Sequence, residues 1–222
     1  HADKVYTESY DKLILSPGAK PVVPQMVGLD SADNVFVLRN IPDLDKILNA
    51  LNDTKAKCAT VIGAGFIGLE MAENLSKKGL QVTIVEKAPH VLPPLDEEMA
   101  AFVKDELTRN GITVYTNQSA KAFKDNGKVI ILEDGSELLS DITIMSVGVQ
   151  PESNLAKEAG LKLGMRGGIL VNEYYQTSNP DIYAVGDAII VKQEITGQYA
   201  LISLASPASR QGRQVADNIA GI

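Results

Sequence analysis

The sequence is poor in the residues that build disulfides and metal centres. Its 222 residues include one cysteine, Cys58, and two histidines, His1 and His90. One cysteine cannot form an intrachain disulfide or a cysteine metal cluster, and two histidines do not make a metal site by themselves. We therefore expect no metal, and we expect a reducing, cytoplasmic setting.

The chain also lacks a long hydrophobic run and an excess of positive charge. No apolar stretch approaches the roughly 20 residues of a membrane span, and the polar N-terminus does not follow the pattern of a signal peptide. With a formal net charge of −7, the chain has no overall basic character with which to attract nucleic acid or an anionic membrane. We therefore expect neither as a partner.

Strand and helix patterns alternate along the middle of the chain. After a strand pattern at 33–40, the apolar spacing predicts helices at 41–53, 66–78 and 95–111 and strands at 59–62, 82–86, 112–116 and 142–147. The handedness of βαβ crossovers places the last four strands in one parallel sheet. Two turn signals between residues 120 and 140 predict a β-meander. The predicted fold class is therefore α/β, with a Rossmann-like parallel sheet and a meander.

In the helix predicted at 95–111, apolar residues recur at helical spacing. We expect Met99, Phe102, Val103 and Leu107 to share its buried face.

Three glycines with the spacing of a dinucleotide-binding turn follow the strand at 59–62. They are Gly63, Gly65 and Gly68 in the stretch VIGAGFIGLEMAENL. The first glycine permits the tight turn, the second lets the backbone approach a pyrophosphate, and the third lets the helix pack against its strand. A helix N-terminus also favours phosphate. The alternative, an ordinary strand–helix turn without a ligand, has less support because strand, glycines and helix occur in the required order.

An acidic residue, Glu86, ends the next strand pattern. In dinucleotide-binding folds an acid about 20 residues after the glycines accepts hydrogen bonds from the adenosine ribose. Its charge would repel a 2′-phosphate, so the sequence favours NAD(H) over NADP(H). Lys87 follows directly and weakens this preference.

Several motifs together resemble one family. The stretches LILSPGAKPVVP, VIGAGFIGLEMAENL, VGVQPESNLAKEAGL and TSNPDIYAVGDA resemble the pyridine nucleotide–disulfide oxidoreductases, which bind FAD and NAD(P), and they cover nearly the whole chain. LASPASRQGRQVADNI is similar to the single-cysteine branch of coenzyme A-disulfide reductases, NADH oxidases and peroxidases, and NADH-dependent persulfide reductases. PPLDEEMA looks most like the coenzyme A-disulfide or persulfide reductases.

The resemblance implies two sets of cofactor-binding residues. The NAD(H) set contains the glycine turn and the residues expected near the nicotinamide: Gly63, Gly65, Phe66, Ile67, Gly68, Glu70, Glu86, Lys87, Val147 and Gly148. The FAD set contains the residues expected at the flavin, its ribityl chain and its edge: Ser16, Pro17, Gly18, Gly186, Asp187, Leu204 and Ala205. Taken alone, Gly186 and Asp187 are better explained as a turn and its cap.

The resemblance also implies the domain organisation. Residues 1–35 and 149–222 would form parts of an FAD-binding domain, and residues 36–148 would form the NAD(H)-binding domain. The sequence has one glycine fingerprint where the family has two. We therefore expect a fragment that lacks the N-terminal FAD motif with its redox cysteine and the C-terminal dimerisation domain of a homodimer. Cys58 matches no redox position, so we assign no catalytic residue and expect the chain to be inactive alone.

The expected function is the nucleotide-binding part of a flavoprotein that passes hydride from NADH through FAD to an acceptor. The acceptor is a coenzyme A disulfide, a persulfide, a peroxide or oxygen, and the sequence does not select among them. Two alternatives stay open: a non-catalytic NADH-binding or sensing module, and an electron-transfer flavoprotein reductase. Near the C-terminus, Arg210 and Arg213 either contact a phosphate or lie on a solvated helix face.

Overall fold

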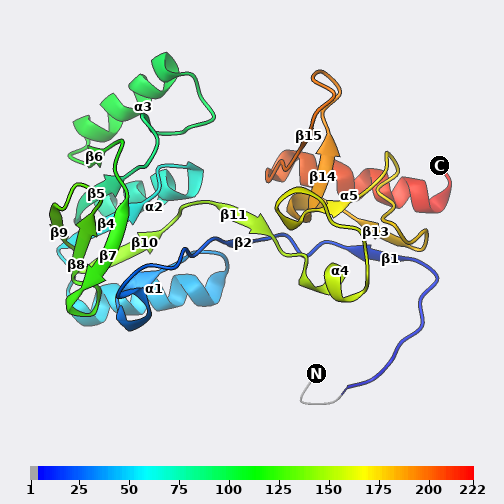
Figure 1. The fold of residues 1–222 in the computed structure, drawn as a ribbon, viewed down its shortest axis with the longest axis horizontal. Helices are drawn as coiled ribbons and strands as arrows, with labels where there is room; N and C mark the ends of the chain where they lie inside the picture. Colours follow the sequence, from blue (N-terminus) through cyan, green and yellow to red (C-terminus); the bar gives the residue numbers. More distant parts are fainter. Residues whose placement is uncertain (1–4) are drawn as a thin grey trace. The chain divides into compact units, whose positions relative to one another are not determined.

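The computed structural model describes residues 5–222, which form two compact units. Unit 1 contains the N-terminal residues up to Lys20 together with Gln150–Ile222, and unit 2 contains Pro21–Val149. Strands β2 (Ala19–Pro21) and β11 (Val149–Pro151) pair at the two places where the chain passes from one unit to the other. Each unit has its own hydrophobic core. Figure 1 labels the helices and strands of both units.

A five-stranded parallel sheet forms the centre of unit 2. Its order is β3 (Val35–Phe36), β10 (Ile142–Met145), β4 (Cys58–Ile62), β5 (Gln81–Val85) and β6 (Thr113–Tyr115). All neighbouring strands are parallel. The predicted α/β class and parallel sheet are therefore confirmed. The strand predicted at 33–40 is shorter in the structure, and β3 is an edge strand.

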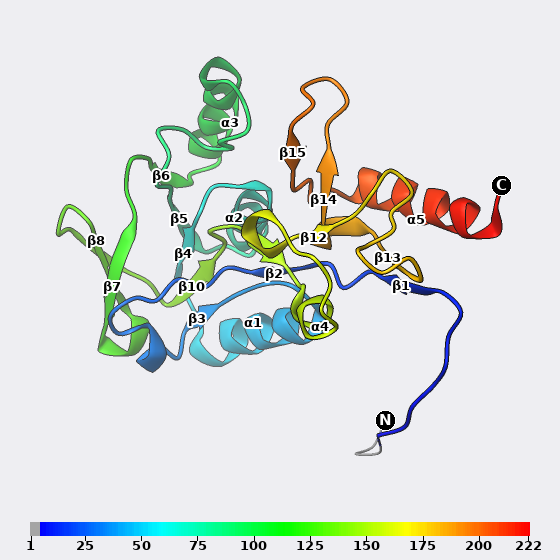
Figure 2. The same ribbon diagram turned by 45° about the vertical axis from the view of Figure 1, so that its right-hand side comes forward.

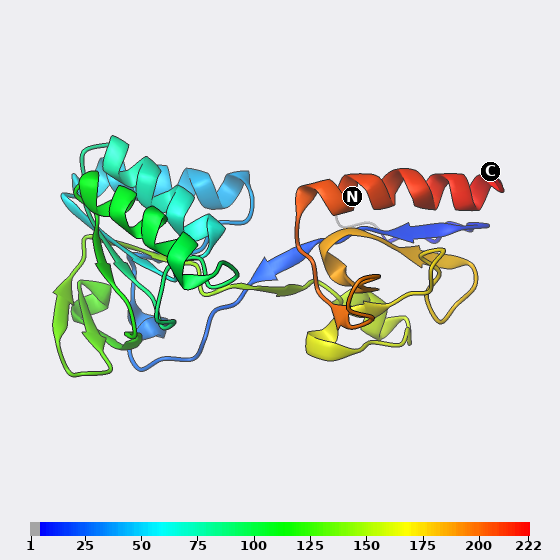
Figure 3. The same ribbon diagram turned by 90° about the horizontal axis from the view of Figure 1, so that it is seen from above.

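Three helices cover one face of this sheet (Figure 3). They are α1 (Ile41–Thr54), α2 (Phe66–Lys77) and α3 (Glu97–Arg109). Alternate strand residues such as Val61 and Ile84 point toward them and pack with Ile47 and Leu75. Helix α1 begins with a capping box, in which Asn40 and Asp43 each accept the other's backbone N–H.

The predicted β-meander covers the opposite face. It consists of β7 (Ala120–Lys124), β8 (Val129–Leu132) and β9 (Glu137–Leu139), all antiparallel. Ile62 and Val85 point toward the meander and pack with Phe123 and Ile130. The central strands are therefore buried on both faces, as their continuous apolar runs require.

The predicted buried face of α3 is wrong in part. Leu107 is buried and Val103 is partly buried, but Met99 and Phe102 are 57% and 71% exposed. The residue that packs against the sheet in their place is Ala100. Residues 100, 103 and 107 form one stripe of the helix, whereas 99 and 102 belong to the neighbouring stripe. Both stripes contain apolar residues, so hydrophobic periodicity alone did not distinguish them.

The structure also places residues 21–35 differently from our expectation. We assigned them, with residues 1–20, to the FAD-binding part, but they belong to unit 2. Met26, Leu29, Ala32 and Val35 pack against the meander core. Apolar spacing within the segment does not show in the sequence which core these residues join, because that depends on contacts with the distant meander.

Unit 1 contains a pair of parallel strands, β1 (Leu13–Leu15) and β13 (Ile182–Ala184), which lie side by side in Figure 2. Helix α5 (Ala205–Ala220) packs on β13 through Val215 and Tyr183. The other elements of the unit are α4 (Asn154–Glu158), β12 (Ile169–Leu170), β14 (Ile189–Lys192) and β15 (Tyr199–Ala200). No helix within residues 5–222 has the length and apolar character needed to cross a bilayer.

Candidate functional site

The first glycine of the motif occupies a turn that no other residue fits. Gly63 follows β4, has a φ of 103°, and donates its N–H to the Val85 carbonyl at 2.8 Å. A Cβ at Gly63 would lie 2.4 Å from the Ser146 carbonyl oxygen. The turn therefore requires glycine both for its left-handed backbone and for its contact with the residue after β10.

The other two glycines serve different purposes. A Cβ at Gly68 would lie 2.0 Å from the Gly63 carbonyl oxygen, so Gly68 is what lets α2 pack against the turn. At Gly65, the N-cap of α2, the φ is −77° and a Cβ would meet no described atom within 4 Å. The backbone at Gly65 is therefore open to a ligand, whereas Gly68 is closed by packing.

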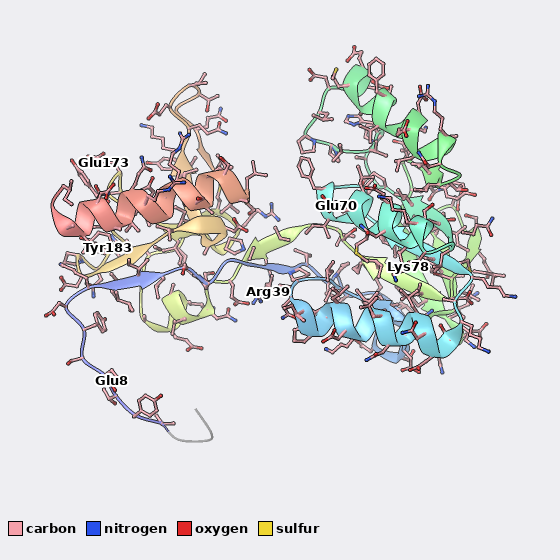
Figure 4. The ribbon with its side chains drawn as sticks, turned by 180° about the vertical axis from the view of Figure 1, so that it is seen from behind. Glu8, Arg39, Glu70, Lys78, Glu173 and Tyr183 are labelled. Carbon is pink, nitrogen blue, oxygen red and sulfur yellow. The ribbon has the colours of Figure 1, made fainter. Side chains whose placement is uncertain are left out.

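The N-terminus of α2 is accessible. Within residues 5–222, no side chain caps it, and the first N–H groups of any helix lack partners inside the helix. Phe66 and Ile67 in this first turn are 58% and 44% exposed. Glu70, which is labelled in Figure 4, is exposed one turn further along α2. The start of α2 thus offers free N–H groups and a partial positive charge to an anion.

Glu86 lies against the glycine turn. The β4–β5 register pairs Ile62 with Val85, so the residues that follow the two strands are neighbours. Glu86 is 8% exposed. Its Oε2 accepts the Ala64 N–H at 2.6 Å, and its Oε1 accepts the Ala88 N–H at 2.6 Å. The structure therefore brings Glu86 to the motif and fixes its carboxylate, while Lys87 points into solvent.

The predicted residues Val147 and Gly148 lie beside the same turn. They follow β10, which pairs with β4 so that Met145 is opposite Ile62. Val147 is 39% exposed, and Gly148 is exposed with a φ of 115°. The ends of β4, β5 and β10 thus bring the glycine turn, Glu86 and Val147 to one edge of the sheet.

The sequence analysis missed Ser146, which holds this turn together. Its hydroxyl lies 3.1 Å from the Ile62 carbonyl oxygen and 3.0 Å from that of Gly63, so its single proton is in position to donate to either oxygen. A signal for this residue was present in the sequence. A Ser-x-Gly follows an apolar strand twice, at Ser146–Gly148 and at Ser16–Gly18.

Replacing Ser146 with alanine should destabilise unit 2 by about 1 kcal/mol, because the turn loses a hydroxyl donor. Urea unfolding monitored by circular dichroism would measure the change. Ser119→Ala in the same unit is a control. Equal stability of S146A and the wild type would show that the Ser146 hydroxyl does not stabilise the turn.

In unit 1 the predicted flavin residues gather at the ends of β1 and β13. The two strands are parallel and in register, and the Leu15 carbonyl accepts the Val185 N–H at 3.0 Å. Ser16 and Gly18 after β1, and Gly186 and Asp187 after β13, line one pocket of about 420 Å³. Pro17 lies between the first two. The remaining wall includes three residues of α5: Ala208, Gly212 and Val215.

Two other predicted residues lie outside the lining of this pocket. Leu204 is the N-cap of α5 and Ala205 its first residue; both are exposed. A residue that sequence reasoning missed is Gln211, which is buried and accepts the Gly186 N–H at 2.7 Å through Oε1. No local pattern marks Gln211, because its role depends on the packing of α5 against the β13 turn.

Cys58 is at the opposite end of β4 from the glycine turn. Its thiol lies 3.4 Å from the Asp141 Oδ2, and burial raises the pKa of this thiol above its ordinary value. A raised pKa reduces the thiolate fraction at neutral pH. Within residues 5–222, no three His, Cys, Asp or Glu side chains are arranged to hold a metal ion.

We expect iodoacetamide to alkylate Cys58 several-fold more slowly in the folded protein than in urea at pH 7.5, because only the thiolate reacts. The rate should increase with pH up to the raised pKa. Mass spectrometry of timed samples would measure it. Equal rates in the folded and unfolded protein would contradict this prediction.

Comparison with known proteins shows which family the chain resembles. The family model described as pyridine nucleotide-disulphide oxidoreductase matches residues 2–212. An NADH oxidase of Methanocaldococcus jannaschii is 43% identical over 96% of this chain and 48% of its own length. A coenzyme A disulfide reductase of Staphylococcus haemolyticus is 36% identical over 97% of this chain and 48% of its own length.

A solved structure of reduced Bacillus anthracis CoADR-RHD is similar at a TM-score of 0.97, with 50% identity over 99% of this chain and 40% of that one. The chain thus spans about half the length of the curated relatives it matches. The family match covers most of the chain and includes the glycine turn and the β13 turn. The chain therefore belongs to the pyridine nucleotide-disulphide oxidoreductase family.

Proposed function

We propose that unit 2 binds NADH and that unit 1 contributes to an FAD site, as parts of an NADH-dependent flavoprotein oxidoreductase. The observation that carries the proposal is the buried Glu86 carboxylate, which is fixed at 2.6 Å from the Ala64 N–H of the glycine turn. Family membership and the names of the relatives support it.

Glu86 would hold the adenosine ribose. Each carboxylate oxygen has two lone pairs, and the backbone N–H groups of Ala64 and Ala88 use one on each. Each oxygen therefore retains capacity to accept a ribose hydroxyl. A 2′-phosphate would place further negative charge against this carboxylate, so we propose that NADH is preferred to NADPH.

The glycine turn would hold the pyrophosphate. The open backbone at Gly65 and the accessible N-terminus of α2 provide N–H donors and partial positive charge for it. Phe66 and Ile67 belong to the same turn. We assign Val147, Gly148 and Glu70 to the nicotinamide side, on the basis of the family resemblance and of their exposure.

In unit 1, Asp187 and Gly186 would hold the ribityl part of FAD, and Ser16, Pro17 and Gly18 would border the flavin. Four of these five residues line the 420 Å³ pocket, and Gln211 fixes the Gly186 backbone. Leu204 and Ala205 are assigned to the flavin edge by the resemblance. Bound FAD supplies the two-electron redox chemistry, and the protein supplies position and environment.

For the whole protein, we propose transfer of hydride equivalents from NADH to a small-molecule acceptor. The relatives are named as an NADH oxidase and a coenzyme A disulfide reductase. The acceptor that we propose is a disulfide, a persulfide, a peroxide or oxygen.

Titration of the purified chain with NADH, NADPH and FAD tests the proposal. We expect saturable enhancement of NADH fluorescence, weaker binding of NADPH, and quenching of FAD fluorescence that decreases in Asp187→Ala. Saturable NADH binding without any FAD binding would favour an NADH-binding module instead. No binding of NADH would refute the assignment of unit 2.

A further inference from the structure

The exposed apolar stripe of α3 borders a groove beside α2. Met99 and Phe102 are 57% and 71% exposed, although Ala100 and Leu107 of the same helix pack against the sheet. Helices α2 and α3 lie side by side over the sheet in Figure 3, and a groove of about 550 Å³ lies between them, with Phe102 in its lining. Exposed apolar residues that gather at a hollow mark an interaction surface more often than apolar residues scattered singly.

The base of this α2–α3 groove is apolar. Leu69 comes from α2, Val103 and Leu107 come from α3, and Ile112 precedes β6. Leu107 and Ile112 are 9% and 4% exposed, and Leu69 and Val103 are partly buried. The base is therefore continuous with the core of unit 2, and an apolar group placed in the groove would extend that core.

The two walls of the groove have the length of a short helix. The residues that line it run from Leu69 to Lys77 on α2 and from Phe102 to Asn110 on α3. Eight residues of helical rise make each wall about 12 Å long. A helix that lays its apolar face into a groove contacts it with residues spaced i, i+3, i+4 and i+7, which span about 10 Å. The groove therefore accepts two turns of a further helix.

The borders of the groove are acidic. Glu70 and Glu73 on α2 and Glu106 on α3 belong to its lining, and Lys77 is the cation among the lining residues. Lys77 pairs with Glu73, whereas Glu70 forms no ion pair within residues 5–222. Like charges three residues apart on a helix repel each other. A cation lying over Glu70 and Glu73 would reduce this repulsion.

We propose that the α2–α3 groove docks a basic amphipathic helix of a partner protein. The apolar face of that helix would cover Phe102 and the base of the groove, and its Lys or Arg side chains would lie against the three glutamates. Charge complementarity selects this occupant over an acidic helix. It also disfavours a second copy of this chain, because a two-fold dimer through the groove would bring two sets of acidic borders together.

Fluorescence anisotropy of a labelled synthetic peptide tests the site. The probe is a leucine–lysine helix of about 18 residues, or five turns, with leucines at i, i+3, i+4 and i+7. A peptide with glutamate in place of each lysine is the charge control. We expect the 222-residue chain to bind the lysine peptide saturably at about 0.15 M salt, and the glutamate peptide roughly tenfold or more weakly. Equal binding of the two peptides would contradict a basic partner.

A pair of alanine variants locates the bound peptide. Phe102→Ala removes an exposed apolar side chain from the groove, and the control Leu139→Ala removes one that is 76% exposed on β9. We expect roughly tenfold weaker binding of the lysine peptide in Phe102→Ala, because buried aromatic anchors carry much of the energy of an interface, and unchanged binding in Leu139→Ala. Equal affinities in the two variants, or no saturable binding by the wild type, would overturn the proposal.

A second pair of variants separates docking in the groove from general attraction to an acidic protein. E73Q/E106Q removes two carboxylates from the groove, and the control E133Q/E137Q removes two from the meander. Each of the four carboxylates pairs with a neighbouring Lys or Arg, so both variants lose the same charge and the same number of ion pairs. We expect several-fold weaker peptide binding, with a smaller salt dependence, in E73Q/E106Q alone. An equal loss in both variants would overturn the proposal.

Sedimentation at increasing protein concentration tests a second copy as the occupant. We expect no self-association that depends on Phe102, and a dimer that Phe102→Ala dissociates would overturn the proposal by assigning the groove to a second copy. Of the residues that line the groove, Glu70 alone is also assigned to the NADH site, and neither test variant changes it. NADH affinity should therefore be unchanged in Phe102→Ala and E73Q/E106Q, which separates this proposal from the cofactor assignment.

Discussion

Replacing Glu86 with glutamine is expected to lower the affinity for NADH by roughly 10- to 100-fold, since a charged hydrogen bond contributes about 1.5–3 kcal/mol. The variant loses the charge that would hold the ribose hydroxyls. In the wild type, the two carboxylate oxygens accept the backbone N–H groups of Ala64 and Ala88. Glutamine has only one side-chain oxygen, so its N–H₂ group would face one of these two N–H groups. Fluorescence titration with NADH and with NADPH measures the effect. The preference for NADH should decrease in the same variant.

The Glu86 variants should also reveal the structural part of this role. Glu86→Ala leaves two buried N–H donors without an acceptor, at about 1–3 kcal/mol each, so we expect a clear loss of stability in urea unfolding. Glu98→Gln, an exposed position on α3, is the matched control and should change neither property. Unchanged NADH affinity in Glu86→Gln would remove Glu86 from the site, whereas unchanged stability in Glu86→Ala would show that other groups replace its hydrogen bonds.

The second large effect is a contrast between two glycines of the same motif. Gly68→Ala would place a Cβ 2.0 Å from the Gly63 carbonyl oxygen and 2.7 Å from the Ser146 Oγ, so α2 must move away from the turn. Overpacking of this kind costs about 1–3 kcal/mol or more. We therefore expect Gly68→Ala to lose both thermal stability and NADH binding.

Gly65→Ala should keep its stability and lose NADH binding. Its φ of −77° suits alanine, and a Cβ there meets no described atom within 4 Å. The open space is where the pyrophosphate is proposed to lie, so the methyl group should reduce affinity by roughly tenfold or more, about 1.4 kcal/mol.

Thermal unfolding and NADH titration of both glycine variants separate the two effects. Gly79→Ala is the control, because Gly79 also lies in open space but outside the motif. Its positive φ strains an alanine, so the control is expected to lose some stability and to keep its NADH affinity. Normal NADH affinity in Gly65→Ala would place the pyrophosphate elsewhere. Normal stability in Gly68→Ala would show that α2 can shift without disturbing the turn.

Much of unit 2 follows from the sequence because its signals are local. The order of strands and helices, the parallel sheet and the meander are expressed in apolar periodicity and in turn residues that act within a few positions. The glycine motif is similar: Gly63 and Gly68 are required by contacts within one strand–turn–helix segment and the strand end beside it. The same locality places Glu86 at the end of β5, next to the turn.

What the sequence by itself determined was therefore the fold class, the family and the glycine turn with Glu86 at the adjacent strand end. Only the tertiary structure decided which stripe of α3 is buried, with Ala100 inside and Met99 outside, and which core residues 21–35 join. It also decided that Ser146 and Gln211 hold the two turns. The physical reason is that these choices depend on contacts between residues far apart in the chain, and no local pattern encodes which distant surfaces meet.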